Sequence, residues 1–232
     1  MPYAERLEER RLFATVFQGI PGYYEVWGTT GDDVIAVSVD QANSTFTLDG
    51  VTYDGVLQVS VYGIDGNDNL SVAGPGINVS AVIRGGLGDD TLTLALDGAV
   101  WGEEGKDTIT LRDSFRGEAY GGPGNDTISI QGDTIDARVN GEEDNDILVA
   151  LDNHYGVILF GGVGDDRLYG SKFNDVMFDG PGRDFVFGLA GNDEFDSRDG
   201  EQDWIMGGDG NDVLWADPAE GGIHGMEHVF YG

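Results

Sequence analysis

The sequence predicts an all-β solenoid, a coil of short strands stacked one turn above another, and three observations carry this prediction. A Gly-rich turn closed by an Asp recurs through most of the 232 residues. An alternating apolar segment follows each turn, as in a half-buried strand. The 39 glycines have no collagen period and therefore belong to turns. Length alone allows one or two domains, but the repeat favours a single elongated domain.

The repeating unit is clearest in the stretch Gly161–Tyr169, with sequence GGVGDDRLY. Its three glycines allow positive φ, so that successive carbonyl groups can point into one small space. Asp166 adds a carboxylate to that space, and Leu168 begins an alternating strand. Six to eight carbonyl and carboxylate oxygens are the ligands that Ca²⁺ prefers. The unit is therefore interpreted as a calcium-binding turn that leads into a strand.

The Asp that closes the turn occurs in twelve copies along the chain, so the motif is far more specific than an isolated Gly-Asn-Asp string. The copies are Asp33, Asp68, Asp90, Asp107, Asp126, Asp146, Asp166, Asp175, Asp184, Asp193, Asp203 and Asp212. Turn glycines of the three most regular copies, also candidate calcium-binding residues, are Gly86, Gly88, Gly122, Gly124, Gly162 and Gly164.

This pattern, G-G-x-G-x-D-x-(apolar)-x, resembles the RTX (repeats-in-toxin, hemolysin-type) calcium-binding family over roughly residues 26–216. The resemblance implies a right-handed parallel β-roll, with Ca²⁺ held between stacked turns.

The net charge of −31 requires either disorder or neutralisation by cations, because self-repulsion of that size opposes compaction. An apolar content of 40% in regular alternation argues against disorder. So acidic a surface excludes nucleic acid as a partner. Turn sites of this kind usually fill at the calcium concentrations found outside cells, so we expect a secreted, extracellular protein. No apolar run is long enough for a transmembrane helix, and the first residues lack the apolar core of a secretory signal.

Residues 1–24 differ from the repeats. The segment Glu5–Ala14, ERLEERRLFA, looks like a Leu-Glu-x-Arg-x-Leu-Phe-x-Ala motif found near the start of large exported bacterial repeat proteins. That likeness implies an export or sorting signal. The alternative is a short amphipathic helix or a frayed end that caps the roll.

The β-roll is expected over residues 25–215, with an irregular first coil at 25–72. Segments 34–40, 44–48 and 51–53 alternate as strands, with turn signals at Asn43 and at Asp49-Gly50. We interpret them as a β-hairpin inserted in the first coil, where it would cover an otherwise open strand edge.

Residues 68–166 carry one motif per coil, and residues 166–215 carry two, so the two edges of the roll are not equivalent. The long edge is expected to hold Asp68, Asp90, Asp107, Asp126, Asp146, Asp166, Asp184 and Asp203. The short edge is expected to hold Asp175, Asp193 and Asp212. One ion between each pair of neighbouring turns predicts about nine Ca²⁺, about seven on the long edge and two on the short one. Nine ions would bring the net charge to about −13.

The residue two positions after each Asp is predicted to point inward, and so is the residue two positions before the first turn glycine. The first set is Leu70, Leu92, Ile109, Ile128, Leu148, Leu168, Met177, Val186, Phe195, Ile205 and Leu214, and the second is Val26, Ile83, Val100, Val139 and Leu159. Outward positions just before the turns form a largely aromatic stripe: Trp27, Tyr62, Arg84, Trp101, Tyr120, Asn140 and Phe160, continued by Tyr169, Phe187 and Met206. This stripe is either a contact surface or a cover for the strand ends.

Residues 216–232 leave the turn pattern and are expected to form a last strand or cap. His224–His228 spells H-x-x-E-H, a zinc-peptidase signature that requires both histidines on one face of a helix. Glycines interrupt it here, so a zinc site is not expected. Adjacent acidic pairs such as Asp89-Asp90 repeat at many turns, which favours ligands over catalytic dyads.

The sequence thus predicts a secreted, non-enzymatic calcium-binding β-roll, folded and rigidified by Ca²⁺. A structural role in an extracellular matrix, surface layer or self-assembling filament is favoured. One alternative is a carbohydrate- or surface-binding adhesin module that uses the aromatic stripe. Another is an accessory region of an exported enzyme, although little chain lies outside the repeats to hold a catalytic domain.

Overall fold

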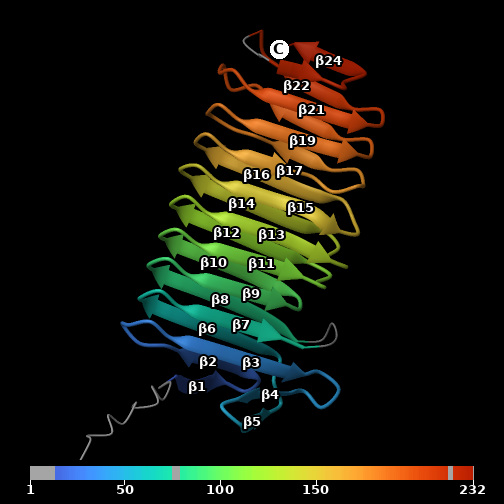
Figure 1. Ribbon diagram of the computed structural model, residues 1–232. Helices are drawn as coiled ribbons and strands as arrows, with labels where there is room; N and C mark the ends of the chain where they lie inside the picture. The colour runs from blue at the N-terminus through green and yellow to red at the C-terminus, as the bar shows by residue number, and fades with distance from the viewer. Residues whose placement is uncertain (1–13, 75–78, 219–221, 232) are drawn as a thin grey trace, which may run out of the picture.

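A computed structural model describes residues 14–74, 79–218 and 222–231 of the chain. The chain winds into a flattened coil whose strands run along two facing sheets, with the turns at two opposite edges (Figure 1). Sheet A contains β1 (Thr15–Ile20), β2 (Tyr23–Trp27), β6 (Gln58–Asp65), β8 (Ser80–Leu87), β10 (Gly98–Glu104), β12 (Gly117–Pro123), β14 (Ala137–Glu143), β16 (Val157–Val163), β18 (Val176–Phe178), β20 (Glu194–Ser197), β22 (Val213–Ala216) and β24 (His228–Tyr231). Sheet B contains β3 (Val34–Asp40), β4 (Thr45–Leu48), β5 (Val51–Asp54), β7 (Asn69–Ala73), β9 (Thr91–Ala95), β11 (Thr108–Arg112), β13 (Thr127–Gly132), β15 (Ile147–Asn153), β17 (Arg167–Tyr169), β19 (Phe185–Ala190), β21 (Trp204–Asp209) and β23 (Gly222–His224).

Successive coils stack in parallel register, so equivalent residues of neighbouring repeats lie side by side. Ile109 in β11 pairs with Ile128 in β13, and Phe160 in β16 pairs with Phe178 in β18. The described residues form strands, turns and bends, without a helix. The predicted all-β parallel roll is confirmed.

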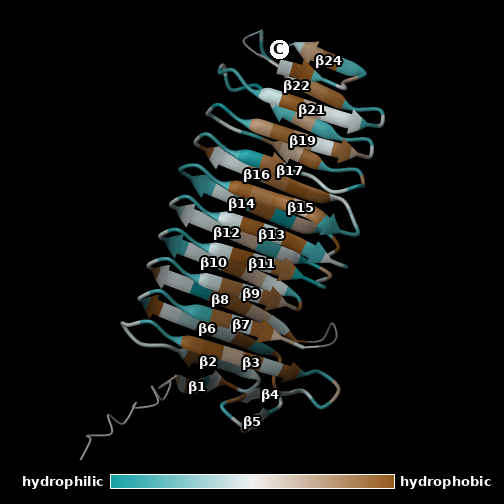
Figure 2. Cartoon of the chain, in the orientation of Figure 1, coloured by the Kyte–Doolittle hydropathy of each residue, from teal (hydrophilic) through white to brown (hydrophobic). Residues whose placement is uncertain are grey.

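Alternation along the strands produces the core, because every second side chain faces the opposite sheet. Strand β3 shows the pattern fully, with Ile35, Val37 and Val39 buried and their neighbours exposed. All residues predicted to point inward are buried, and each is at most 1% exposed. Apolar strands between polar turns are visible in Figure 2. The interior is therefore a narrow apolar ladder, and the polar turns lie outside it.

The first coil carries the antiparallel insertion that the alternation predicts. β4 pairs antiparallel with β3 and with β5, and Asp49 and Gly50 form the tight turn with φ of 50° and 77°. These strands extend sheet B beyond β3. At the same end of the solenoid, β1 pairs antiparallel with β2 and extends sheet A. The parallel edges of β2 and β3 are thereby paired, as edge protection requires.

The two terminal segments differ in how much the structure describes. The export-like motif lies outside the described residues except for Ala14. At the other end, β23 and β24 continue sheets B and A in parallel register with β21 and β22. The region expected to be a last strand or cap is thus a further coil. His224 and His228 of the zinc-like motif lie on strands of opposite sheets, not on one helix face.

The outward aromatic residues form two stripes on opposite sheets, and this corrects the single stripe expected from the sequence. Trp27 stacks on Tyr62 and Trp101 on Tyr120 on sheet A, where Arg84 also lies over Trp101. Tyr169 and Phe187 stack on each other on sheet B. The sheet A stripe continues instead through Phe178, since Phe160 stacks on it. The two groups are separated because Phe160 precedes a long-edge turn and Tyr169 a short-edge turn.

Across the described residues, no helix of a length and apolar character suited to spanning a membrane is present.

Candidate metal centre

The Asp residues predicted for the long edge form one continuous ladder. In each turn the Asp backbone N–H donates to Oδ1 of the Asp one coil further on, as from Asp126 to Asp146 at 2.8 Å. The same bond, at 2.7–2.8 Å, links Asp33, Asp68, Asp90, Asp107, Asp126, Asp146, Asp166, Asp184 and Asp203 in order. Each carboxylate therefore has one oxygen held against the backbone. Asp33, which was not assigned to the long edge from the sequence, is the first residue of this ladder.

In most of the ladder Asp residues, the second carboxylate oxygen is buried and accepts no hydrogen bond. This holds for Oδ2 of Asp68, Asp90, Asp107, Asp126, Asp146, Asp166 and Asp184 on the long edge, and of Asp193 and Asp212 on the short edge. A buried carboxylate oxygen without a partner is costly, and either a bound cation or protonation of the carboxyl group would relieve that cost. These nine oxygens are the strongest sign of a cation site among the described residues.

All of these oxygens except that of Asp184 border a small space between neighbouring turns. A Cβ built on Gly141 would lie 2.1 Å from Oδ2 of Asp146 and 2.3 Å from the carbonyl oxygen of Gly161, one coil further on. The same arrangement recurs at Gly63, Gly85, Gly102 and Gly121. The absence of a side chain at the first turn position thus leaves room between a carboxylate and a carbonyl. This donor set of hard oxygens fits Ca²⁺.

The short edge carries a second ladder, which extends one coil beyond the predicted residues. Asp175 N–H donates to Asp193 Oδ1 and Asp193 N–H to Asp212 Oδ1, each at 2.9 Å. Asp212 N–H then donates to Oε2 of Glu227 at 2.8 Å. Glu227 belongs to the zinc-like motif, and its role here is that of a ladder carboxylate. The repeat pattern does not identify Glu227, because the pattern specifies Asp at this position.

The glycines proposed from the sequence occupy left-handed backbone positions in the turns. Gly86, Gly88, Gly122, Gly124, Gly162 and Gly164 have φ between 112° and 147°. In other coils the second glycine is replaced by Ile64, Glu103 or Glu142, whose φ values are 96°, 75° and 81°. A side chain at such φ is strained, so stacking of the coils must impose this turn even where glycine is missing.

Protein groups satisfy the carboxylate in the first turn of each ladder. Thr29 donates its backbone N–H and its hydroxyl to Oδ2 of Asp33, with the hydroxyl at 2.9 Å. Ser171 donates its backbone N–H to Oδ2 of Asp175 at 2.7 Å, and its hydroxyl lies 3.0 Å from Oδ1. Asp175, a predicted ligand, therefore differs from Asp193 and Asp212. In the sequence, these two turns could have been recognised by the Thr or Ser that follows the first turn glycine.

Burial raises the pKa of the ladder carboxyl groups above the ordinary value of 3.8, because desolvation disfavours the charged form. The hydrogen bond from the preceding Asp N–H opposes this shift. The pKa is raised to about 6 in Asp107, Asp166 and Asp175, to about 7 in Asp90, Asp126 and Asp193, and to about 8 in Asp146 and Asp184. Burial also raises the pKa of Asp68 and Asp212.

Acidification should partly replace calcium in folding the chain. A carboxyl group with a raised folded-state pKa stabilises the fold fully below its unfolded pKa of 3.8, and that stability is lost as pH rises through the folded pKa. In EDTA, the far-UV circular dichroism signal for β structure should therefore grow as pH falls from 8 to 5.5, because protonation relieves Asp90, Asp126 and Asp146. Carboxyl groups with ordinary pKa values stay charged over this range. A β signal in EDTA that is the same at both pH values would contradict this prediction.

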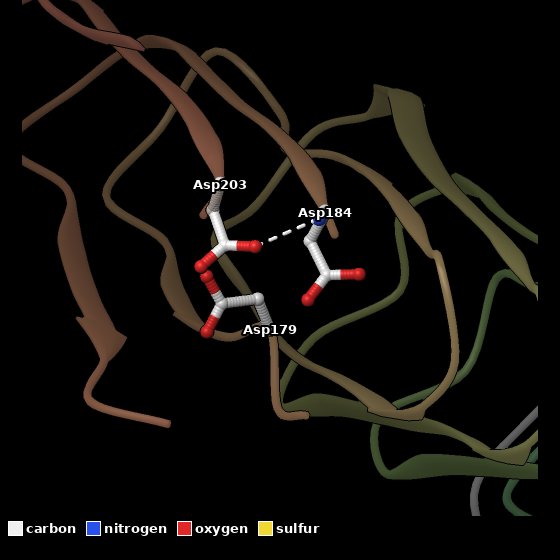
Figure 3. Close-up of side chains that lie close together, drawn as sticks. All are labelled: Asp179, Asp184 and Asp203. Atoms are coloured by element: carbon white, nitrogen blue, oxygen red, sulfur yellow. Dashed lines mark hydrogen bonds between the residues drawn. The ribbon is translucent and has the colours of Figure 1, made fainter. Parts of the chain in front are cut away.

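One gap of the long edge contains an acidic group that the repeat pattern does not predict. Asp179, Asp184 and Asp203 are all buried, and each offers a carboxylate oxygen within 4.8 Å of the others (Figure 3). Asp179 stands where earlier turns begin with glycine, which was a visible departure from the motif.

Comparison with known protein families agrees with this geometry. The RTX calcium-binding nonapeptide repeat matches the chain in four copies, at residues 82–96, 118–129, 159–196 and 197–218. These copies contain several of the turns whose carboxylates form the two ladders. No curated protein sequence matches the chain.

Proposed function

Because this chain carries the repeats of the RTX calcium-binding family, we propose that it is a secreted structural protein that calcium folds and rigidifies. In this proposal the ladder carboxylates and turn carbonyls hold Ca²⁺ between coils. The ions neutralise the buried charge and tie each coil to the next, which makes the solenoid a stiff rod. No catalytic step is assigned to the chain. The main support is the row of nine buried carboxylate oxygens without hydrogen-bond partners.

We further propose that the rod binds about nine Ca²⁺, one beside each of these oxygens. Seven lie on the long edge, in the gaps between successive turns from Asp68 to Asp203. The other two lie beside Asp193 and Asp212, where Cβ atoms built on Gly188 and Gly207 would approach Asp Oδ2 and the carbonyl oxygen of the next coil. The gap beside Asp175 is excluded because Ser171 satisfies that carboxylate.

Loss of one ladder carboxylate should remove calcium from the middle of the long edge. Asp146→Ala deletes an unpartnered Oδ2 and leaves the Asp126 N–H without its acceptor. Isothermal titration calorimetry should therefore show fewer bound ions than the unmodified chain. Thermal unfolding at saturating Ca²⁺ should show a loss of roughly 2–4 kcal/mol, since a buried charge-assisted hydrogen bond is lost with the ion.

Asp113→Ala is the matched control on the other edge. Asp113 is exposed and accepts a 3.2 Å hydrogen bond from Asp133 N–H in a plain turn. Its removal should leave the number of bound ions unchanged. A drop in stoichiometry equal to that of Asp146→Ala would show that both edges bind calcium in this part of the roll.

A second proposal, which concerns assembly, is that the rods join end to end into filaments. Both ends of the solenoid expose large apolar side chains: Phe17 is 59% and Ile20 64% exposed on β1, and Phe230 is 53% and Tyr231 64% exposed on β24. A head-to-tail joint between such ends does not close and so generates a filament. The alternative, an adhesin module, is favoured by the row of stacked aromatic residues along sheet A, which would be the contact surface for a polysaccharide or a cell surface.

Sedimentation velocity in millimolar Ca²⁺ should show a concentration-dependent series of species larger than the monomer. Phe230→Asp combined with Tyr231→Asp should return the sample to monomer, because charges would replace the apolar end. Phe173→Asp, at a turn residue that is 46% exposed, is the control and should leave assembly unchanged. A strictly monomeric wild-type chain at high protein and calcium concentrations would end the filament proposal and favour the adhesin module.

A further inference from the structure

The first turn position of the long edge is occupied by glycine in every coil from Gly28 to Gly161. These equivalent residues form a column along the edge, and in the following coils the column no longer contains glycine. Phe160 pairs with Phe178, and Phe178 pairs with Asp196. Asp179 therefore occupies the position equivalent to Gly161 one coil further on, and Ser197 occupies the equivalent position in the coil after that. The earlier members of the column are Gly28, Gly63, Gly85, Gly102, Gly121 and Gly141. At this point the gap between coils acquires a side chain.

The Asp179 side chain brings its charge directly to the ladder carboxylates. Asp179, Asp184 and Asp203 are 2%, 1% and 3% exposed. Figure 3 shows the carboxylate of Asp179 next to that of Asp203, with Asp184 turned toward both. Asp184 N–H donates to Oδ1 of Asp203 at 2.8 Å, as elsewhere in the ladder. The gap thus keeps the regular ladder geometry and adds a third carboxylate.

Hydrogen bonds do not neutralise this cluster. The hydroxyl of Ser197 lies 2.5 Å from Oδ2 of Asp179 and 3.0 Å from Oδ2 of Asp203, yet it has one proton and can donate to one of them at a time. Oδ2 of Asp184 is buried, faces the cluster and accepts no hydrogen bond. Oδ1 of Asp179 accepts the backbone N–H of Gly180 at 2.9 Å, whereas Oδ2 of Asp184 has no donor and lies among the three buried carboxylates. A cation at this point would satisfy all three.

We propose that the gap lined by Asp179, Asp184, Asp203 and the Ser197 hydroxyl is a distinct calcium site, the tightest in the chain and the first to fill. This inference rests on the proposed calcium-binding function and adds an order of filling to it. Ca²⁺ affinity in oxygen sites rises with the number of charged ligands and with site rigidity. The glycine-lined gaps combine Asp carboxylates with a turn carbonyl, as at Asp146 and Gly161. Here a further carboxylate, that of Asp179, enters the gap.

The position of this site gives it a structural consequence. It lies between the β18–β19 turn and the β20–β21 turn, in the part of the roll where both edges carry ladders. Filling it would fix four strands of the two sheets in register at low calcium. The weaker gaps on either side could then fill against an ordered neighbour, since stacked repeats stabilise one another through their interfaces.

Calorimetry in calcium-buffered solution tests the order of filling on the full chain. The unmodified chain should bind one ion about ten-fold or more tightly than the rest. Asp179→Gly restores the glycine of the other turns, so the separate tight step should disappear and every ion should bind with the weaker affinity of the glycine-lined gaps. Asp196→Asn is the control: it removes a nearby charge that pairs with Arg198 outside the cluster, and the tight step should persist.

A terbium titration locates the first site without altering any ligand. Trp204 adjoins Asp203, and Trp215 pairs across the strands with Asp196, so both lie near the cluster. The first equivalent of Tb³⁺ should be sensitised by tryptophan in the unmodified chain. Trp204→Phe with Trp215→Phe should abolish that emission, and Trp27→Phe with Trp101→Phe should preserve it.

The outcomes separate this inference from the proposed function. A tight step that survives Asp179→Gly, or first-equivalent Tb³⁺ emission that depends on Trp27 and Trp101, would overturn the assignment to Asp179. Several calcium ions of equal affinity would also overturn it while leaving the β-roll proposal intact. No calcium binding at all would end the proposed function itself.

Discussion

Removing calcium should unfold most of the solenoid, and this is the largest effect expected for the chain. At pH 8, EDTA should reduce the far-UV circular dichroism signal to that of a largely disordered chain, and millimolar Ca²⁺ should restore the β signal. The physical reason is the buried row of ladder carboxylates, whose unpartnered oxygens have no compensating charge without a cation. The overall charge of −31 adds to the same repulsion.

Magnesium at the same concentration is the control for simple charge screening. Mg²⁺ demands near-ideal octahedral geometry and gives up its water reluctantly, so turn carbonyls and carboxylates suit it poorly. It should restore much less β signal than Ca²⁺. A β spectrum that EDTA leaves unchanged at pH 8 would show that the coils stack without calcium and would reject the proposed mechanism.

Gly124→Ala should be among the most damaging single methyl additions in the turns. Gly124 has φ of 140°, and a Cβ there would lie 1.7 Å from the carbonyl oxygen of Gly105 in the neighbouring coil. The side chain is disfavoured at this φ, and the two stacked turns would have to separate. Strain and separation together should destabilise the calcium-loaded protein by roughly 3 kcal/mol or more, measured by thermal unfolding.

Gly50→Ala separates the two contributions. Gly50 also has positive φ, 77°, but a Cβ there meets no atom within 4 Å, because the turn between β4 and β5 is open to solvent. It should cost only about 1 kcal/mol, the strain of the left-handed conformation. Equal losses in the two variants would mean that backbone strain dominates and that contact between stacked turns contributes little.

The sequence by itself determined the features that repeat. Alternation around residues such as Ile109 and Leu148 identified the core, because an inward position in one coil is inward in all coils in register. The change in Asp spacing at Asp166 separated the two edges, and the structure has Asp184 and Asp175 on different ladders. The turn glycines of positive φ were also predictable, since few other residues adopt that conformation without strain.

Only the tertiary structure decided what happens where the repeat departs from its pattern. Ser171 satisfies Asp175, Asp179 adds a third carboxylate to its gap, and Glu227 continues the short-edge ladder. The Asp184 and Asp212 contacts depend on which carboxylate lies opposite in the next coil, 19 and 15 residues away, whereas Ser171 lies four residues before Asp175 in the same turn. A periodic motif predicts which residues of neighbouring coils lie side by side only where every coil follows the motif. Where one residue departs from it, the contact between coils depends on how the strands pair, because strand pairing brings together oxygens that are far apart in the sequence.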